Sequence, residues 1–170
     1  ANKIYEVDSH MILSTAGITS DARVLIERAQ VLAQQHRVTY DSPIEPELII
    51  KDISNIKQQF TQYGGARPFG VSVMLAGLNN KKTELFTSDV TGNYFGYHAN
   101  AIGESDDKAK EKLREKYKKD LNIKKGVKVA LEIFKEIQGD KFDINRFELC
   151  FINKDEEKIH RIEGEEINSI

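Results

Sequence analysis

The chain has 170 residues, the usual size of one domain, and 39% of them are hydrophobic, enough to build a core without disulfides. Its 25 Lys and Arg residues nearly balance 27 Asp and Glu, so no overall field would draw it to nucleic acid or an anionic membrane. The single cysteine, Cys150, favours a reducing compartment, and no apolar run approaches the roughly 20 residues of a membrane span. The first residues lack a signal-peptide pattern, so export is not expected.

The chain begins with a strand pattern that two helices follow. We expect short strands over 4–7 and 11–15, separated by the turn signal Asp8-Ser9. Good N-cap residues and apolar spacings of three and four predict a helix over about 20–37. A second helix follows two prolines, and its apolar stripe is Ile49, Ile53, Ile56 and Phe60. Two helices with so short a link are expected to pack as antiparallel neighbours in one layer.

A glycine-rich and proline-bearing turn over 63–70 ends the second helix. Glycine permits the positive φ that closes a helix, while Pro68 fixes its own φ and keeps Arg67 out of the α region. Arg67 is best explained as an ion pair or carbonyl clamp at this turn, although it could also be an ordinary solvated arginine. The residues of this predicted structural turn are Gly64, Gly65, Arg67, Pro68 and Gly70.

The strand that follows, over 71–77, is the predicted central strand of a sheet. Val71, Val73 and Leu75 would face one side, and the residues between them are also small or apolar. We therefore expect both faces of this strand to be covered. A polar turn at 79–82 leads into strands over 84–88 and 94–97, which complete an antiparallel meander.

The last third of the chain returns to a helical period and then to strands. A charged helix is expected from Ser105, as its cap, to about Tyr117. A further helix, ending near Gly139, has an apolar face made of Ile123, Val127, Ala130, Phe134 and Ile137. A final hairpin is expected over 147–152 and 158–162. Helix pairs inserted between antiparallel hairpins predict an α+β protein, a four-layer α/β/β/α sandwich formed by one domain over 1–170.

The sequence offers little catalytic chemistry. The four histidines, at positions 10, 36, 98 and 160, have no companion cysteine and form no HExxH pair, so neither a metal site nor a cofactor is expected. Cys150 alternates with Glu148 and Ile152 in a predicted strand, and it is better explained as a small core residue than as a nucleophile. The glycines at 64–65 and 103 match neither the Walker lysine pattern nor the GxGxxG pattern of phosphate-binding loops. From the residues alone, the chain looks like a scaffold without a visible catalytic constellation.

Four segments, in order along the chain, closely resemble alpha-type subunits of the core proteasome. They are AGITSDAR at 16–23, YGGARPFGVS at 63–72, SDVTGNY at 88–94 and ANAIG at 99–103. The resemblance runs from about residue 3 to residue 170. It implies a sandwich of the N-terminal nucleophile hydrolase type, here with its N-terminal strands missing. No gating tail, first helix or first strands precede Ala1, so the chain could be the remainder of a longer polypeptide.

The resemblance implies a noncatalytic subunit of the outer seven-membered ring, involved in assembly, activator docking and substrate entry. The nucleophilic threonine begins the mature chain of beta-type relatives, whereas this chain begins with Ala1. By resemblance, Gly17 and Ile18 would line the pocket for activator tails, and the helix carrying Asp21 and Arg23 would dock against the beta ring. Such a pocket also needs a lysine from an earlier strand, which we expect to be absent from this sequence. The implied partners are other alpha-type subunits, the beta-type ring and a regulatory particle or other activator, with no nucleic acid or membrane.

Finer expectations also come from the resemblance. The segments at 56–58, 61–65 and 92–94 favour the eukaryotic alpha type-4 subunit. The resemblance also implies a role in ubiquitin-dependent protein degradation and a location in cytoplasm and nucleus. One alternative is a catalytic beta-type subunit or a related N-terminal nucleophile hydrolase, which would need a Thr, Ser or Cys at its mature N-terminus. A second alternative is a free-standing oligomeric binding scaffold.

Overall fold

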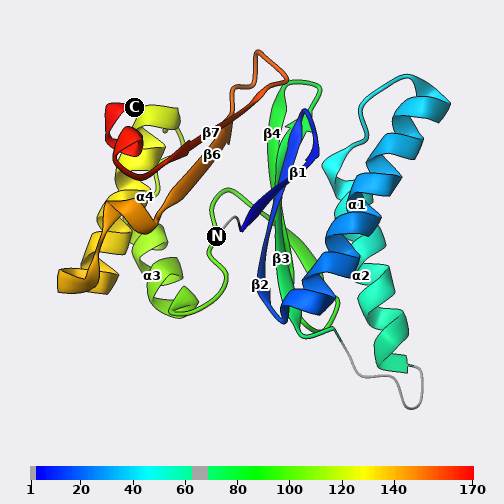
Figure 1. Cartoon of the computed structure of the whole chain (residues 1–170), viewed down its shortest axis with the longest axis horizontal. Coiled ribbons are helices and arrows are strands. Elements are labelled where there is room, and N and C mark those ends of the chain that lie inside the picture. The colour runs from blue at the N-terminus through cyan, green and yellow to red at the C-terminus, as the bar shows by residue number, and fades with distance from the viewer. Residues whose placement is uncertain (1–2, 63–68) are drawn as a thin grey trace.

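The computed structural model describes residues 3–62 and 69–170, which are arranged in four layers (Figure 1). Two helices cover one face of a five-stranded sheet, and a two-stranded sheet with two further helices lies on the other side. In chain order the elements are β1 (Ile4–Asp8), β2 (Met11–Gly17), α1 (Thr19–Tyr40), α2 (Pro46–Gln62), β3 (Val71–Asn79), β4 (Lys82–Ser88), β5 (Tyr94–Tyr97), α3 (Asp106–Lys116), α4 (Ile123–Gln138), β6 (Glu148–Ile152) and β7 (Ile159–Glu163). The α/β/β/α order predicted from the sequence is confirmed.

The larger sheet is an antiparallel meander in the order β1-β2-β3-β4-β5, so β3 is its central strand, as predicted. The β3–β4 turn places Asn80 and Lys81 at φ 49° and 67°, the left-handed pair that matches the twist of a two-residue hairpin. Its edge strand β1 is held from two sides. The Gln30 amide donates to the Glu6 carbonyl at 2.9 Å, and the Arg161 guanidinium of β7 donates to the Ile4 carbonyl at 2.7 Å.

The main core lies between this sheet and the antiparallel helices α1 and α2. It includes completely buried Leu25, Ile49, Ile53 and Val73. The expected stripe of α2 is only partly right at its end, because Phe60 is 38% exposed and packs edge-to-face on Phe69 at 4.7 Å. The other face of β3 is half-buried rather than fully covered, since it looks toward the smaller second sheet. The prediction that both faces are covered was therefore too strong.

The α3–α4 half of the molecule is more open than the sequence predicted. Ala130 and Phe134 were expected on the inner face of α4, yet both are exposed, and on that helix only Ile133 is buried. The reason is geometric: a two-stranded sheet is about 10 Å wide and cannot cover two packed helices. Lys112 and Lys116 of α3 instead pair with Glu136 of α4, each at 2.7 Å, and hold the helices together at their surface.

Local details at the ends of elements also differ from expectation. Ser105 precedes α3 but adopts φ 62° and makes no side-chain cap hydrogen bond, so its predicted capping role is wrong. The chain also contains short 3-10 helices that the sequence pattern did not predict: Gly139–Lys141, Ile144–Arg146 and Gly164–Ser169. None of the helices in the described part of the chain is long and apolar enough to cross a membrane.

Candidate functional site

The junction between β2 and α1 brings together four residues that the sequence had singled out in separate places. Gly17 ends β2, Ile18 is the N-cap residue of α1, and Asp21 lies in its first turn. The Ile18 backbone N–H donates to the Gly70 carbonyl at 2.9 Å, and the Gly70 N–H donates to the Asp21 carboxylate at 2.9 Å. The start of β3 is thereby fixed to the start of α1 by two reciprocal hydrogen bonds.

At Gly17 a close approach of the backbone excludes a side chain, whereas at Gly70 the nearest neighbour is the end of a side chain. Gly17 has φ 133°, and a Cβ there would overlap the Gly70 carbonyl and lie 2.9 Å from the Val71 Cα. A Cβ on Gly70 would lie 2.6 Å from the terminal methyl group of Ile18. Gly70 directly precedes β3 and takes part in the two hydrogen bonds described above, and its role in a structural turn stays a prediction. The other residues of that prediction, Gly64, Gly65, Arg67 and Pro68, lie outside the described residues.

Asp21 and Arg23 of the predicted docking helix differ in environment. The Asp21 side chain is only 8% exposed and accepts the Gly70 hydrogen bond, so the structure gives it an internal role. Arg23, two residues further along the helix, is exposed and lines the neighbouring cleft. Of these two residues, only Arg23 is placed to meet another molecule.

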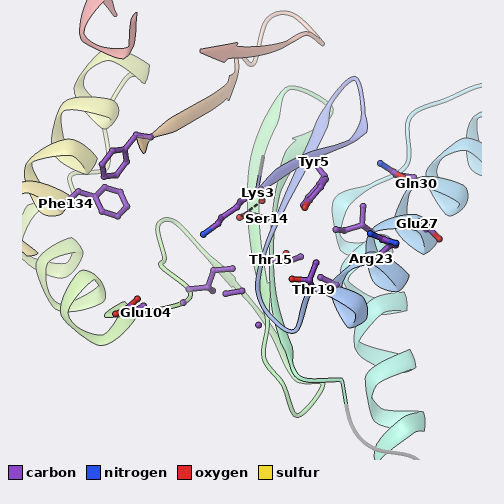
Figure 2. A pocket seen from close by; sticks show the side chains of 17 residues that line it. Lys3, Tyr5, Ser14, Thr15, Thr19, Arg23, Glu27, Gln30, Glu104 and Phe134 are labelled. Carbon is purple, nitrogen blue, oxygen red and sulfur yellow. Dashed lines mark hydrogen bonds between the residues drawn. The ribbon is translucent and has the colours of Figure 1, made fainter. Parts of the chain in front are cut away.

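A cleft of about 930 Å³ opens beside this junction and runs around the free edge of β1 (Figure 2). Tyr5, Arg23 and Glu27 lie on the α1 side, whereas Lys3 and Glu104 lie in the space toward α3 and α4. The full lining is Lys3, Tyr5, Ser14, Thr15, Ala16, Gly17, Thr19, Ala22, Arg23, Ile26, Glu27, Gln30, Ile102, Gly103, Glu104, Phe134 and Phe147. The cleft has two cationic and two acidic side chains, so its charge is locally mixed.

Lys3 is the residue that the sequence reasoning missed. It directly precedes β1, is exposed, and lines the same cleft as Gly17. The Ser14 hydroxyl donates to its carbonyl at 3.2 Å and fixes its backbone, while the ammonium points away from α1 (Figure 2). The sequence could have indicated Lys3, because it lies immediately before a predicted strand that pairs with β2. The expectation that the pocket lacked a lysine is therefore corrected.

A serine–lysine cluster in the core was the other arrangement with apparent catalytic chemistry. The Lys57 ammonium donates to the Ser88 hydroxyl at 3.1 Å and to the Asp89 carbonyl at 2.9 Å, and Ser54 also donates to Ser88 at 3.1 Å. Burial lowers the pKa of Lys57 from its ordinary 10.5 to about 8, against the opposing attraction of Asp89. A lysine with such a pKa beside a hydroxyl is chemically a nucleophile–base pair.

Burial excludes a catalytic role for this cluster in the folded chain. Lys57 and Ser88 are 0% exposed and Ser54 is 2% exposed, and none of them lines the cleft described above. The Ser88 hydroxyl accepts hydrogen bonds from both neighbours, so both lone pairs of its oxygen are already used within the core. The cluster is instead a structural clamp that joins α2 to the turn between β4 and β5.

The β4–β5 turn is fixed by its own polar groups. Burial alone would raise the pKa of Asp89, but hydrogen bonds from the Thr91 hydroxyl and from the Thr91 and Asn93 backbone N–H groups lower it. Gln58 donates to the Gly92 carbonyl at 3.2 Å and ties the same turn to α2. Segment 88–94, one of the four that carried the resemblance, is thus a rigid turn anchored on a helix.

Metal and thiol chemistry find little support in this arrangement. Within residues 3–62 and 69–170, no three His, Cys, Asp or Glu side chains are grouped so that they could hold a metal ion. Cys150 is half-buried in β6, and burial raises the pKa of its thiol, so the reactive thiolate is disfavoured.

Comparison with known proteins agrees with this geometry. A family model described as "Proteasome subunit" matches residues 1–152. The chain is 36% identical to the proteasome subunit alpha of Methanosarcina thermophila over 167 residues, 98% of this chain and 68% of that protein. It is 36% identical to that of Methanopyrus kandleri over 152 residues (89% and 62%) and 38% identical to that of Pyrococcus horikoshii over 165 residues (97% and 63%). The chain thus spans about two thirds of the length of these relatives.

The fold and its relatives define the class first: an α+β sandwich of the N-terminal nucleophile hydrolase type. Within that class, the chain belongs to the proteasome alpha subunit family.

Proposed function

We propose that the chain is a noncatalytic subunit of the outer heptameric ring of a core proteasome, contributing to assembly, activator docking and substrate entry. The observation that carries the proposal is family membership, to which the α1 surface adds physical support. The partners are then other alpha-type subunits, the beta-type ring, and a regulatory particle or another activator. A catalytic beta-type role and a free-standing scaffold are the alternatives that the experiments below separate.

The outer face of α1 supports a docking role for this helix. Val24, Val31 and Val38 recur every seven residues, which is about two helical turns, and so lie along one side of the helix. Their side chains are 53%, 46% and 83% exposed, whereas the opposite face packs Leu25 and Ala29 into the core. An exposed row of apolar residues on a helix that already has a full core face is typical of a protein interface.

The absence of catalysis is the first testable part of the proposal. The cleft presents the hydroxyl groups of Ser14, Thr15 and Thr19, but its described lining contains no histidine or cysteine to activate or replace them. We expect the purified chain not to cleave fluorogenic peptides. Turnover that disappears when a single one of these hydroxyl residues is changed to alanine would overturn the noncatalytic assignment.

The cleft also supports a pocket for the C-terminal tail of an activator. A peptide carboxylate would be attracted by the Lys3 ammonium, which lines the same cleft as Gly17, whereas Ile18, 46% exposed, does not line this cleft and its terminal methyl group lies toward Gly70. Lys3 directly precedes β1, and Gly17 is the last residue of the neighbouring strand β2. We therefore add Lys3 to the proposed pocket residues Gly17 and Ile18.

In particles assembled with this chain, Lys3→Gln should weaken the binding of an activator tail peptide by about two- to fivefold, because a solvent-exposed ammonium–carboxylate contact is lost. Fluorescence anisotropy of the labelled peptide gives the measurement. Lys51→Gln, an exposed lysine on α2, is the matched control and should leave binding unchanged. Equal binding of the peptide with its C-terminus amidated would show that no carboxylate is recognised.

The proposal also includes the type of alpha subunit. The segments at 56–58, 61–65 and 92–94 favour the eukaryotic alpha type-4 subunit, whereas the relatives reported above are archaeal. Participation in ubiquitin-dependent degradation, and a location in cytoplasm and nucleus, follow only if that assignment holds. Sequencing the coding region upstream of residue 1, for a gating tail and helix, tests the type.

A further inference from the structure

A second hollow lies between the two sheets, away from the β1 edge. Its floor is a row of residues across four strands, because Ile12 pairs with Ala76, Ala76 with Leu85, and Leu85 with Tyr97. Phe151 and Ile152 of β6 lie across from this row and also line the space, which measures about 310 Å³. We call this space the inner hollow; its walls are mostly apolar and aromatic.

An adjoining hollow of about 390 Å³ opens toward α3, and we call it the outer hollow. The two spaces share three lining residues, Tyr97, His98 and Tyr117. The His98 and Tyr117 rings are nearly parallel, with an angle of 14° and centroids 6.1 Å apart. The two hollows therefore meet at one aromatic border.

The outer hollow adds positive charge to this apolar space. Lys110 and Arg114 of α3 line it, and no acidic residue does so among those the structure describes. Arg114 is exposed and forms no ion pair or hydrogen bond with the described part of the chain. Lys110 approaches the half-exposed Asp106 at 3.7 Å, a surface contact that is worth little. A guanidinium and an ammonium are thus both available to an anion.

Glu84 also lines the inner hollow, but it does not present a carboxylate to it. It pairs across the sheet with Gly77, where an added Cβ would point at Pro46 in the helical layer. Strand alternation puts Glu84 on that same side, opposite Leu85. Among the described residues, none therefore presents a carboxylate to the inner hollow, and the lysine and arginine of the combined site lie in its outer part.

We propose that the two hollows form one binding site for a small aryl-alkyl monocarboxylate, with its ring in the inner hollow and its carboxylate at Lys110 and Arg114. The volume suits a ligand of about a dozen non-hydrogen atoms, because small-molecule sites begin near 300 Å³. Aromatic walls favour a ring over a flexible chain, since ring pairs add attraction beyond the area they bury. The site shares no lining residue with the β1-edge cleft.

The experiment uses 4-phenylbutyrate as the probe and isothermal titration calorimetry of the full chain. We expect saturable binding with a Kd below about 1 mM, in keeping with a ligand of this size. Acetate, which lacks the ring, and 4-phenylbutanol, which lacks the charge, should each bind at least about tenfold more weakly. Equal binding of the alcohol, or no binding of the carboxylate at millimolar concentration, would overturn the proposal.

Two variants locate the ligand. The double variant Lys110→Gln/Arg114→Gln should weaken the binding of 4-phenylbutyrate about tenfold. Lys118→Gln/Lys119→Gln removes the same charge from exposed residues outside both hollows and should bind as the original chain does. Ala76→Phe fills the inner hollow and should abolish binding if circular dichroism shows an unchanged fold. Identical affinity in the two double variants would contradict the site even if Ala76→Phe failed to fold.

Discussion

Replacing Gly17 by alanine is expected to destabilise the chain by about 3 kcal/mol or more, one of the largest effects of any single methyl group here. The backbone φ of 133° is one that residues with a Cβ rarely adopt, and the added Cβ would overlap the Gly70 carbonyl. Relief requires β2 and the start of β3 to separate, which would break the Ile18–Gly70 hydrogen bond. Urea unfolding followed by circular dichroism measures the change.

Gly126→Ala is the matched control for that substitution. Gly126 lies inside α4, and a Cβ there would meet nothing within 4 Å. Alanine should therefore stabilise the chain by about 0.5–1 kcal/mol through its better helix propensity. If both alanine variants changed stability equally, the close approach at Gly17 would not be a real constraint.

Truncating Lys57 to alanine should cost about 3 kcal/mol, because it leaves a cavity and removes hydrogen bonds to buried oxygen atoms. The Lys57 side chain is completely buried and donates to Ser88 and Asp89. Its pKa of about 8 in the folded chain, against an ordinary 10.5, also predicts a pH dependence. The unfolded chain binds this proton more tightly, so the contribution of Lys57 to stability rises with pH between about 8 and 10.5 and is lost as pH falls through 8.

The comparison that isolates this titration is with Lys57→Met, which keeps the length of the side chain but cannot ionise. Between pH 7 and pH 9 the original chain should gain about 1 kcal/mol relative to this variant. Lys51→Met on the exposed face of α2 is the control and should show no such pH-dependent difference. A difference that is flat with pH would mean that Lys57 does not change its charge in this range.

The burial of Lys57 was visible in the sequence pattern of α2, but its hydrogen-bond partners were not. Ile49, Ile53 and Lys57 recur every four residues, so the lysine stands on the buried face of α2. Periodicity alone could place it there, but polarity favoured a solvated side chain. Its partners Ser88 and Asp89 come from a distant turn, and the pairing of α2 with that turn is tertiary information.

At the Gly17 junction, prediction from the sequence failed for a different reason. Gly70 was singled out from the sequence for its place in a turn, and Gly17 only through the family resemblance. Their contact joins segments more than fifty residues apart, through hydrogen bonds that appear only when β2 and β3 pair in register. Periodicity likewise predicted α4 correctly as a helix but assumed that all its apolar residues were covered. Phe134 is exposed because coverage depends on the width of the neighbouring sheet.

The central claim is that this chain is built to stand beside other subunits in a ring. Native mass spectrometry tests it most directly, after co-expression of the chain with the other proteasome subunits of its own organism. We predict that the chain is recovered in a seven-membered alpha-type ring stacked on beta-type subunits. A complete particle that assembles without it, while the chain remains a monomer or a separate oligomer, would contradict the account.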